Sequence, residues 1–207
     1  MSVAQLSVLT VGHSNHSPKT FLGLLSQHGV TALVDVRSVP YSRLNPQFNR
    51  EVLKHNLNAQ GIKYVFLGHE LGARTDDQSC YENGRVQYAR LAQTDLFRSG
   101  IERVHRGSKT YRIALMCAEK EPLDCHRTLL VARALDELGV SVQHILADGR
   151  LESHDETMER LLDVIGLSSQ DLFRSKERLI AEALARQEER IAYVNKKLTA
   201  DTAGETP

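Results

Sequence analysis

The chain has 207 residues, of which 41% are hydrophobic and 25% are charged, a composition typical of a globular protein. This length predicts one domain with an appendage, large enough to bury a core without disulfide bonds. The 26 acidic side chains balance the 26 basic ones. No overall positive charge therefore draws the chain onto nucleic acid or an anionic membrane, although local basic patches remain open as an alternative.

The cysteines and the N-terminus indicate an intracellular protein. Cys80, Cys117 and Cys125 are odd in number and irregularly spaced, unlike a secreted disulfide framework. No apolar run approaches the roughly 18 residues of a membrane span, and residues 1–9 lack the basic start of a signal peptide. We therefore expect a cytoplasmic protein with no membrane partner.

The first third of the chain predicts alternating strands and helices. Apolar runs bounded by glycine or proline predict buried strands, and apolar residues at helical spacing predict helices. In chain order these are a strand over 6–11, a helix from the cap Ser17–Pro18 to Gly29, a strand over 31–36, a helix over 49–60 and a strand over 62–67.

The middle of the chain continues the alternation after a polar stretch. Residues 73–84 are polar and irregular, which predicts a mobile flap. There follow a predicted helix over 86–104, perturbed at Ser99–Gly100, a strand over 111–116, a helix over 128–138 with Asp124 as its N-cap, and a strand over 140–146.

This order of elements predicts an α/β domain over 1–150, with a mostly parallel sheet of about five strands and helices on both faces. Residues 151–200 predict a C-terminal helical extension, with a helix over 154–165 and a longer helix introduced by a capping pattern at 168–171. Residues 201–207 predict a disordered tail. The apolar stripe of the long helix consists of Leu172, Leu179, Ile180, Ala183, Leu184, Ile191, Val194 and Leu198. This stripe fits either a helix packed on its own domain or a homodimer through that helix.

The most informative segment is MCAEKEPLDCHR, residues 116–127. Ligands of parallel α/β sheets bind beyond the carboxyl ends of the strands. Cys125, His126 and Arg127 are predicted in the first turn of a helix, where free backbone N–H groups and the helix dipole favour anions. The same field lowers the pKa of a nearby thiol, and Cys117 comes from the adjoining strand end.

Three roles are open for the thiols of Cys117 and Cys125. Cys117 or Cys125 is a nucleophile with His126 or His13 as its base, or the two form a redox pair, or both are small buried apolar residues. Cys117, Cys125 and His126 could also supply three metal ligands. Cys-x7-Cys-His is not a usual zinc spacing, so we predict no metal site.

Polar residues follow the other predicted strands as well. Arg37, Arg43, Arg74 and Arg127 indicate an anionic ligand such as a nucleotide, a phosphate ester or a flipped nucleic-acid base. The remaining strand-end residues are His13, Ser14, Asn15, Asp35, Ser42, His69, Glu70 and Asp148.

Five ordered segments resemble a known family of bacterial and archaeal proteins, the domain of unknown function 488. They are TVGHSN (10–15), LVDVRSVPYSR (33–43), GIKYVFLGHELG (61–72), ALMCAEKEPLDCHR (114–127) and HILADG (144–149), which together span about 8–150. The resemblance implies an α/β domain and a functional role for the matching polar residues, but no established reaction. A more glycine-rich pattern would be usual at 68–72, so His69 and Glu70 carry less weight.

The sequence thus predicts an enzyme for an anionic or nucleotide-like ligand, a candidate thiol-dependent hydrolase or transferase with no cofactor identified. Its predicted catalytic residues are His13, Asp35, Cys117, Glu119 and His126. Its predicted substrate-binding or anion-binding residues are Ser14, Asn15, Arg37, Ser42, Arg43, Cys125 and Arg127. The alternatives are a non-catalytic module that binds a nucleotide or nucleic acid, and a thiol redox sensor.

Overall fold

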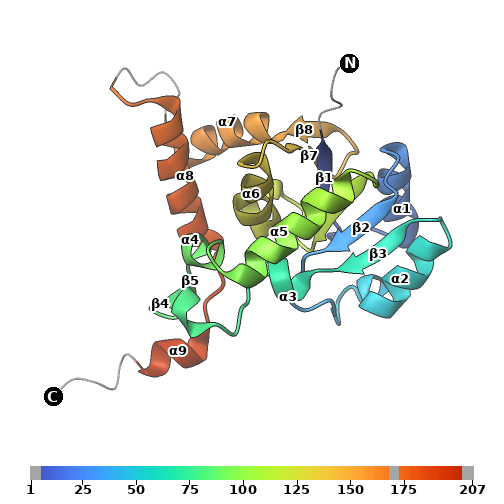
Figure 1. Ribbon diagram of the computed structural model, residues 1–207, viewed down its shortest axis with the longest axis horizontal. Helices are drawn as coiled ribbons and strands as arrows, with labels where there is room; N and C mark the ends of the chain where they lie inside the picture. Colours follow the sequence, from blue (N-terminus) through green and yellow to red (C-terminus); the bar gives the residue numbers. More distant parts are fainter. Residues whose placement is uncertain (1–5, 168–172, 202–207) are drawn as a thin grey trace.

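The computed structural model, which describes residues 6–167 and 173–201, is built around one six-stranded sheet (Figure 1). Its strand order is β3-β2-β6-β1-β7-β8. The strands are β1 Ser7–Gly12, β2 Ala32–Asp35, β3 Lys63–Phe66, β6 Ile113–Cys117, β7 Ser141–Ile145 and β8 Leu151–Ser153. The first five are parallel, and β8 pairs antiparallel with β7. The predicted α/β class and mostly parallel sheet are confirmed, with six strands instead of about five.

Helices cover both faces of this sheet. One apolar cluster joins α1 and α2 to alternate strand residues such as Leu9 and Leu33. The larger cluster joins α5, α6, α7 and α8 to the opposite face, through residues such as Val8 and Val34. The helices are α1 Pro18–Gln27, α2 Arg50–Asn58, α3 Gly68–Leu71, α4 Tyr88–Leu91, α5 Asp95–Ser108, α6 Arg133–Asp136, α7 His154–Ile165, α8 Lys176–Ile191 and α9 Lys196–Asp201. Short helical turns are η1 Pro46–Phe48, η2 Gln78–Cys80, η3 Pro122–Asp124 and the π-helical segment η4 Arg127–Ala132.

The register of the sheet fixes which residues reach its carboxyl edge. Gly12 at the end of β1 lies opposite Cys117 at the end of β6, and Asp35 at the end of β2 lies opposite Met116. Because the three strands are parallel, the loops that leave them emerge on the same side. The end of β6 is therefore flanked by the loops that begin at residues 13 and 36.

Local signals account for the ends of several elements. The Ser17 side chain accepts a hydrogen bond from Thr20 N, and Pro18 occupies the first helical position of α1. Gly29 then adopts a left-handed conformation with φ of 63°. Ser153 and Glu156 form a reciprocal capping box at the start of α7. These bonds satisfy backbone groups that a helix end leaves free.

The predicted helix over 86–104 is wrong in its first half. Residues 85–86 form β5 and α4 follows as a single turn, before Thr94 caps α5 by accepting a bond from Phe97 N. The predicted perturbation at Ser99–Gly100 is also wrong, since both residues lie inside α5. Gly100 is there for close packing, because a Cβ at this position would lie 2.7 Å from Glu70 Cβ.

The polar stretch 73–84 is more ordered than predicted. It contains η2 and the strand β4 Tyr81–Glu82, which pairs antiparallel with β5 Arg85–Val86. The connecting residues Asn83 and Gly84 both have positive φ, 49° and 74°. Two left-handed residues are what a tight hairpin turn requires, and Asn-Gly is the usual pair.

The C-terminal residues pack into the same core as the sheet. The predicted boundary at 150 falls between β7 and β8, and Leu161, Leu179 and Ala183 belong to the larger apolar cluster. In Figure 1, α8 stands beside α7 and runs down past α4 towards α9. Leu179, Ala183 and Leu184 of the apolar stripe are thus buried within the chain, whereas Val194 is 39% exposed.

The predicted apolar residues do not all lie on one helix. Helix α8 ends at Ile191 because Ala192 is extended, and the next residues run beside the hairpin: Val86 N donates to Tyr193 O, and Arg85 pairs with Val194. Ser175 caps α8, whereas the predicted capping pattern 168–171 and residues 202–207 lie outside the described residues.

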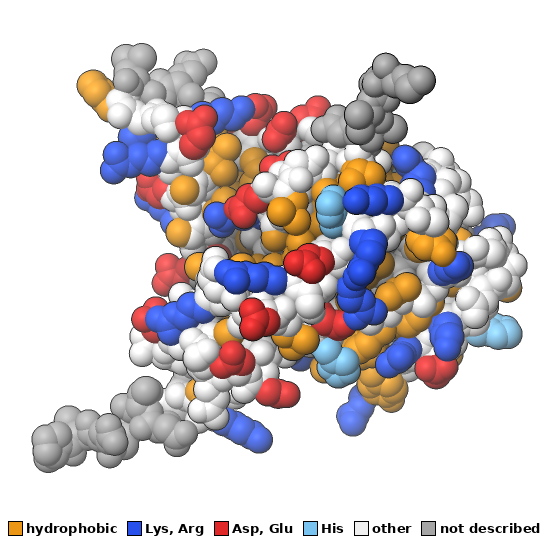
Figure 2. Space-filling model, in the orientation of Figure 1, with side chains coloured by type: hydrophobic (Ala, Val, Ile, Leu, Met, Phe, Trp, Pro, Cys, Tyr) orange, Lys and Arg blue, Asp and Glu red, His pale blue; other side chains and the backbone are white. Residues whose placement is uncertain are grey.

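The surface carries both signs of charge. Figure 2 shows acidic and basic side chains interspersed on the face drawn, in keeping with the zero net charge. Among the residues described, no helix combines the length and apolar character needed to cross a bilayer.

Gly100→Ala is expected to destabilise the fold, whereas Gly23→Ala is expected to stabilise it. Both glycines are inside helices, where alanine gains up to ~1 kcal/mol of helix propensity. A Cβ at Gly23 meets nothing within 4 Å, but at Gly100 it meets Leu71 Cδ2 at 2.8 Å, and such overpacking costs about 1–3 kcal/mol. Urea unfolding of both variants measures this. Equal stabilisation by both substitutions would contradict the packing role of Gly100.

A buried histidine pair predicts loss of stability in mild acid. Thr10 Oγ1 lies 2.8 Å from His144 Nδ1, and His144 Nε2 lies 3.1 Å from His154 Nδ1. Burial lowers the pKa of both rings, that of His144 well below its usual range. The unfolded chain therefore binds more protons below about pH 6.5, so stability present above that pH falls as the pH is lowered.

We expect the free energy of unfolding, measured at pH 7.5 and pH 5.5, to change less in His154→Gln than in the native chain. Glutamine keeps an acceptor for His144 Nε2–H but does not titrate. His55→Gln, at an exposed position on α2, is the control and should keep the native dependence. An unchanged pH dependence in His154→Gln would contradict a contribution from the pair.

Candidate functional site

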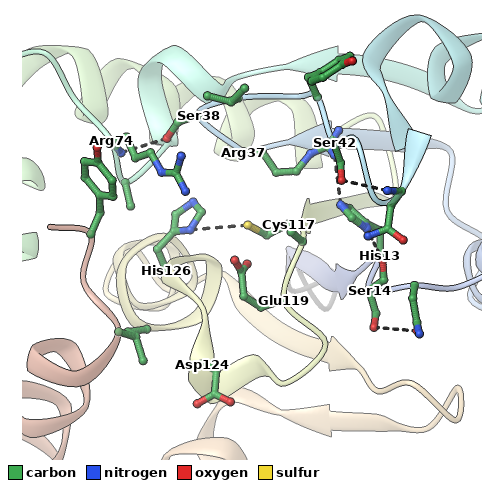
Figure 3. Close-up of a pocket in the computed structure, with 18 of the residues that line it drawn as sticks. His13, Ser14, Arg37, Ser38, Ser42, Arg74, Cys117, Glu119, Asp124 and His126 are labelled. Carbon is green, nitrogen blue, oxygen red and sulfur yellow. Dashed lines mark hydrogen bonds between the residues drawn. The ribbon is translucent and has the colours of Figure 1, made fainter. Parts of the chain in front are cut away.

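A cavity of about 630 Å³ opens at the carboxyl edge of β1, β2 and β6 (Figure 3). Its wall is made of the loops after these strands, the turn before η4, and residues from α4 and the end of α8. The lining residues are His13, Ser14, Asn15, Arg37, Ser38, Val39, Tyr41, Ser42, Asn45, Ala73, Arg74, Tyr88, Cys117, Ala118, Glu119, Asp124, His126, Ile191 and Tyr193.

His13 and Arg37 form one side of the cavity. His13 Nδ1 donates to Ser14 O at 2.8 Å, which leaves Nε2 as an acceptor for Arg37 Nη1 at 3.1 Å. Burial, helped by the charge of Arg37, lowers the pKa of His13 to about 4. His13 is therefore a neutral ring that helps to orient Arg37.

Arg37 is held mainly by Asp35, at the end of β2. Arg37 Nε and Nη2 donate to the two carboxylate oxygens at 2.9 and 2.7 Å, and Nη2 also donates to Phe48 O. Tyr64 donates its hydroxyl to Asp35 at 2.8 Å. Asp35 is fully buried and does not line the cavity, so it acts on the site through Arg37.

The loop after β6 is folded around the side chain of Arg127. Its Nη1 donates to Glu119 O at 2.6 Å and its Nη2 to Lys120 O at 3.2 Å. Arg127 has no exposed surface and does not line the cavity. Gly12 permits the close approach of this loop to β1, because a Cβ there would overlap the Glu119 carbonyl oxygen. The guanidinium predicted to hold an anion is thus used to hold the backbone.

The helix after this loop begins at Arg127, one residue before the predicted start, and is not capped by Asp124. Asp124 is the last residue of η3, whereas Cys125 is extended and its carbonyl accepts the first helical bond, from Thr128 N at 3.0 Å. Cys125 Sγ accepts a bond from Arg127 N at 3.4 Å. Cys125 therefore takes the N-cap position predicted for Asp124, and its sulfur faces the first turn.

Two thiols, one carboxyl group and one imidazole ring converge at the floor of the cavity. Cys117 Sγ lies 3.7 Å from His126 Nδ1, and Cys125 Sγ lies 3.9 Å from the same nitrogen. Cys125 Sγ donates to Glu119 Oε2 at 2.9 Å. Figure 3 shows Cys117, Glu119 and His126 pointing towards one another. We call Cys117, Glu119, Cys125 and His126 the floor cluster.

The orientation of His126 is fixed from behind. His126 Nε2 lies 3.0 Å from the carbonyl oxygen of Val36, which only accepts, so this nitrogen carries a proton. In the neutral ring, Nδ1 is then unprotonated, and its lone pair is directed at the two sulfurs. Burial opposes the charged ring, but contact with Cys125 raises the pKa of His126 above its usual value.

The floor cluster shifts the pKa values of its two thiols in opposite directions. Burial and the neighbouring Cys125 raise the pKa of Cys117 well above its usual range. Burial also opposes ionisation of Cys125, but the bond with Cys117 and the charge of Arg127 lower its pKa well below that range. Burial raises the pKa of Glu119. Ionisation is therefore opposed at Cys117 and favoured at Cys125.

The cavity gathers some of the predicted site residues and leaves others outside. Those that line it are His13, Ser14, Asn15, Arg37, Ser42, Cys117, Glu119 and His126. Asp35, Cys125 and Arg127 lie behind these residues, and Arg43 is exposed on the loop after Ser42. His69, Glu70 and Asp148 do not line the cavity. Glu70 forms an ion pair with Arg103, and Asp148 forms one with Arg150.

Tyr41, Tyr88, Ile191 and Tyr193 also line the cavity but were not predicted as site residues. Tyr41 belongs to the family-like motif over 33–43, which was a signal for it. Tyr88, Ile191 and Tyr193 carried none, because their place depends on how α4 and the end of α8 pack. Arg74 lies over the Tyr193 ring, with its guanidinium 4.8 Å from the ring centre.

The floor cluster is also the group of side chains that could hold a metal ion in the described part of the chain. One ligand atom from each of its four residues lies within 4.8 Å of the other three. Sulfur, imidazole nitrogen and carboxylate oxygen are together a donor set suited to zinc.

A family model described as "Domain of unknown function DUF488" matches residues 17–134. The chain belongs to this family. The DUF488 match includes β2, β3, β6 and the floor cluster, and is narrower than the predicted 8–150, since β1 with His13 and all residues beyond 134 lie outside it. Searches of curated proteins and of solved structures found no match.

Arg37→Met is expected to destabilise the protein by roughly 3–5 kcal/mol, because it leaves the buried Asp35 carboxylate without its cation. The double variant Asp35→Asn/Arg37→Met should lose less, since no unpaired charge remains. Chemical denaturation measures both. The control is Arg133→Met, whose exposed pair with Glu137 is worth about 0–1 kcal/mol. Equal losses in the single and double variants would contradict the ion-pair account.

Proposed function

We propose that this DUF488 protein is an enzyme acting on an anionic substrate of the nucleotide or phosphate-ester class, bound in the strand-end cavity. The observation that carries the proposal is the floor cluster itself. Thiol, imidazole and carboxyl groups lie in mutual contact at the bottom of a cavity whose other walls supply two arginines. A module that only binds would need the arginines but not the buried reactive groups.

The shape and composition of the cavity support a nucleotide-sized ligand. A volume of about 630 Å³ is within the range of small-molecule sites. Arg74 supplies a forked donor for phosphate or carboxylate groups. Arg37, whose Nε and Nη2 bond Asp35, supplies the remaining N–H of its Nη1. Tyr41, which is 62% exposed, and Tyr193, which lies against Arg74, supply aromatic surface in the cavity wall, on which a planar base can stack.

The proposal gives each group a role. Cys117, Glu119 and His126 act at the reacting atoms, which places the enzyme among thiol-dependent hydrolases or transferases. Arg37 binds the anion and His13 orients Arg37, while Ser14, Asn15 and Ser42 bind polar substrate groups. Asp35, Cys125 and Arg127 position these residues from behind.

Arg43 follows Ser42 on an exposed loop, and its proposed role is to contact the anion from outside the cavity. A nucleotide within a nucleic-acid strand presents the same chemistry, and the same two arginines would contact its phosphate. The redox alternative has less support, because Cys117 and Cys125 are only 3% and 1% exposed and sensor thiols are usually accessible.

Cys117→Ser is expected to abolish turnover while leaving ligand binding within about twofold, because serine keeps the shape of the floor but not the sulfur. The assay incubates nucleoside 5′-monophosphates and their phosphate esters with the protein and follows products by ³¹P NMR and chromatography. Cys80→Ser, at a buried thiol outside the cavity, is the matched control and should retain turnover. Binding without turnover in the native chain would favour the non-catalytic module.

Arg74→Gln is expected to weaken binding of AMP or inorganic phosphate about tenfold, the loss of one charge-assisted contact of ~1.4 kcal/mol. Arg98→Gln, at an exposed arginine on α5 that does not line the cavity, removes the same charge and should change the affinity less than about twofold. Isothermal titration measures both. Equal weakening would show that net charge, not the cavity, governs the binding.

A further inference from the structure

The floor cluster has the dimensions of a metal-binding tetrahedron. The bonds of zinc to sulfur, nitrogen and oxygen are about 2.0–2.3 Å long, so neighbouring ligand atoms lie roughly 3.3–3.8 Å apart. Cys117 Sγ and Cys125 Sγ lie 3.7 and 3.9 Å from His126 Nδ1, and all four ligand atoms lie within 4.8 Å of one another. Cys125 Sγ is closer to Glu119 Oε2, at 2.9 Å, because the thiol donates a hydrogen bond to the carboxylate.

The groups behind the cluster are those that orient metal ligands. A ligating histidine usually donates its second nitrogen to a carbonyl or carboxylate, and His126 Nε2 donates to Val36 O at 3.0 Å. A backbone N–H from Arg127 reaches Cys125 Sγ, which stabilises a thiolate. The Arg127 guanidinium holds the carbonyl of Glu119. Three of the four ligands are thus held by hydrogen bonds, which for His126 and Glu119 involve atoms other than the ligating one.

The charges of the floor cluster suit a divalent cation. As metal ligands, two thiolates and one carboxylate carry three negative charges, of which a divalent ion cancels two. The buried guanidinium of Arg127 offsets the third.

We propose that Cys117, Glu119, Cys125 and His126 bind one zinc ion at the floor of the cavity. Two sulfurs with one imidazole nitrogen select zinc over magnesium or calcium, which prefer oxygen ligands. The sequence-based argument against a metal site considered the interval between Cys117 and Cys125 alone. It did not include Glu119, which lies within that interval.

The inference deepens the proposed function, and it rests on that function only for what the ion acts upon. Cys117, Glu119 and His126 line the cavity, whereas Cys125 lies behind them. The ion therefore faces the substrate. An oxygen of the substrate or a water molecule can take the place of the Glu119 carboxylate, and zinc polarises such an oxygen. The sulfur of Cys117 then serves the reaction as a metal ligand.

Metal analysis of the purified chain tests the proposal without any substrate. The native protein, prepared in zinc-supplemented medium without chelators, should carry one zinc ion per chain by mass spectrometry. Cys117→Ser, Cys125→Ser and His126→Gln should each reduce this to background. Cys80→Ser should retain the zinc. Background zinc in the native chain, or equal loss in the Cys80 variant, would overturn the assignment.

Cobalt substitution keeps the test valid if a ligand variant fails to fold. The native chain, stripped with a chelator and titrated with Co²⁺, should show the thiolate-to-metal absorption and the intense visible bands of a four-coordinate site. Zinc should remove these bands at one equivalent. Absence of the thiolate absorption, or rapid joining of Cys117 to Cys125 by peroxide in zinc-treated protein, would contradict the site.

The two proposals fail in distinguishable ways. Arg74 does not ligate the ion, so the loss of AMP affinity in Arg74→Gln can be measured in the chelator-stripped chain as well as in the zinc-loaded one. A chain that binds zinc but no nucleotide or phosphate overturns the proposed function and leaves the metal site. A chain that binds AMP but neither zinc nor cobalt does the reverse.

Discussion

The burial of Arg127 is the interaction on which the geometry of the site depends. Its guanidinium donates to the carbonyl oxygens of Glu119 and Lys120, and burying such a charge without partners would be costly. The loop after β6 therefore folds around it and returns to the sheet. This path brings Cys125 and His126 back to Cys117 after only a short excursion. Without the Arg127 guanidinium, the carbonyl groups of Glu119 and Lys120 would lose these two hydrogen bonds, which stabilise the turn of the loop.

The second constraint is the parallel register of β1, β6 and β2. It places His13 and Arg37 on loops that flank the end of β6, and His13 N donates to Cys117 O as the sheet pairing continues past Gly12. Arg37 is held by Asp35 of the neighbouring strand. The His13–Arg37 side of the cavity and the floor cluster are thus parts of one hydrogen-bonded edge, so a shift of either strand would displace both.

Sequence patterns predicted the elements whose signals are local. The five parallel strands, the capped start of α1 at Ser17 and Pro18, and α7 over 154–165 follow from apolar periodicity and capping residues, and the structure confirms them. The errors arise where packing overrides a local signal. Gly100 was taken as a helix perturbation, but it allows α5 to approach α3. The Asn83–Gly84 turn was a hairpin signal overlooked within a polar stretch.

The same distinction applies to the candidate site. Residue type and strand order were enough to select the residues, but not to say which way each side chain points. Arg127 and Arg37 looked alike in sequence, as forked donors after a strand. One lies behind the backbone and the other lines the cavity, because Arg37 has a carboxylate beside it on β2 and Arg127 has only carbonyl groups. The outcome depends on the path of a loop, which composition and spacing do not encode.

The reactive floor and the walls of the cavity come from different parts of the chain. The floor cluster lies within residues 17–134, the part that matches the DUF488 family model. His13, Ser14 and Asn15 precede that match, and Ile191 and Tyr193 follow it by more than fifty residues. Tyr193 is placed by the end of α8 and by pairing with the β4–β5 hairpin. The wall at Ile191 and Tyr193 therefore depends on how α8 ends against the hairpin, whereas the floor depends on the path of the loop around Arg127.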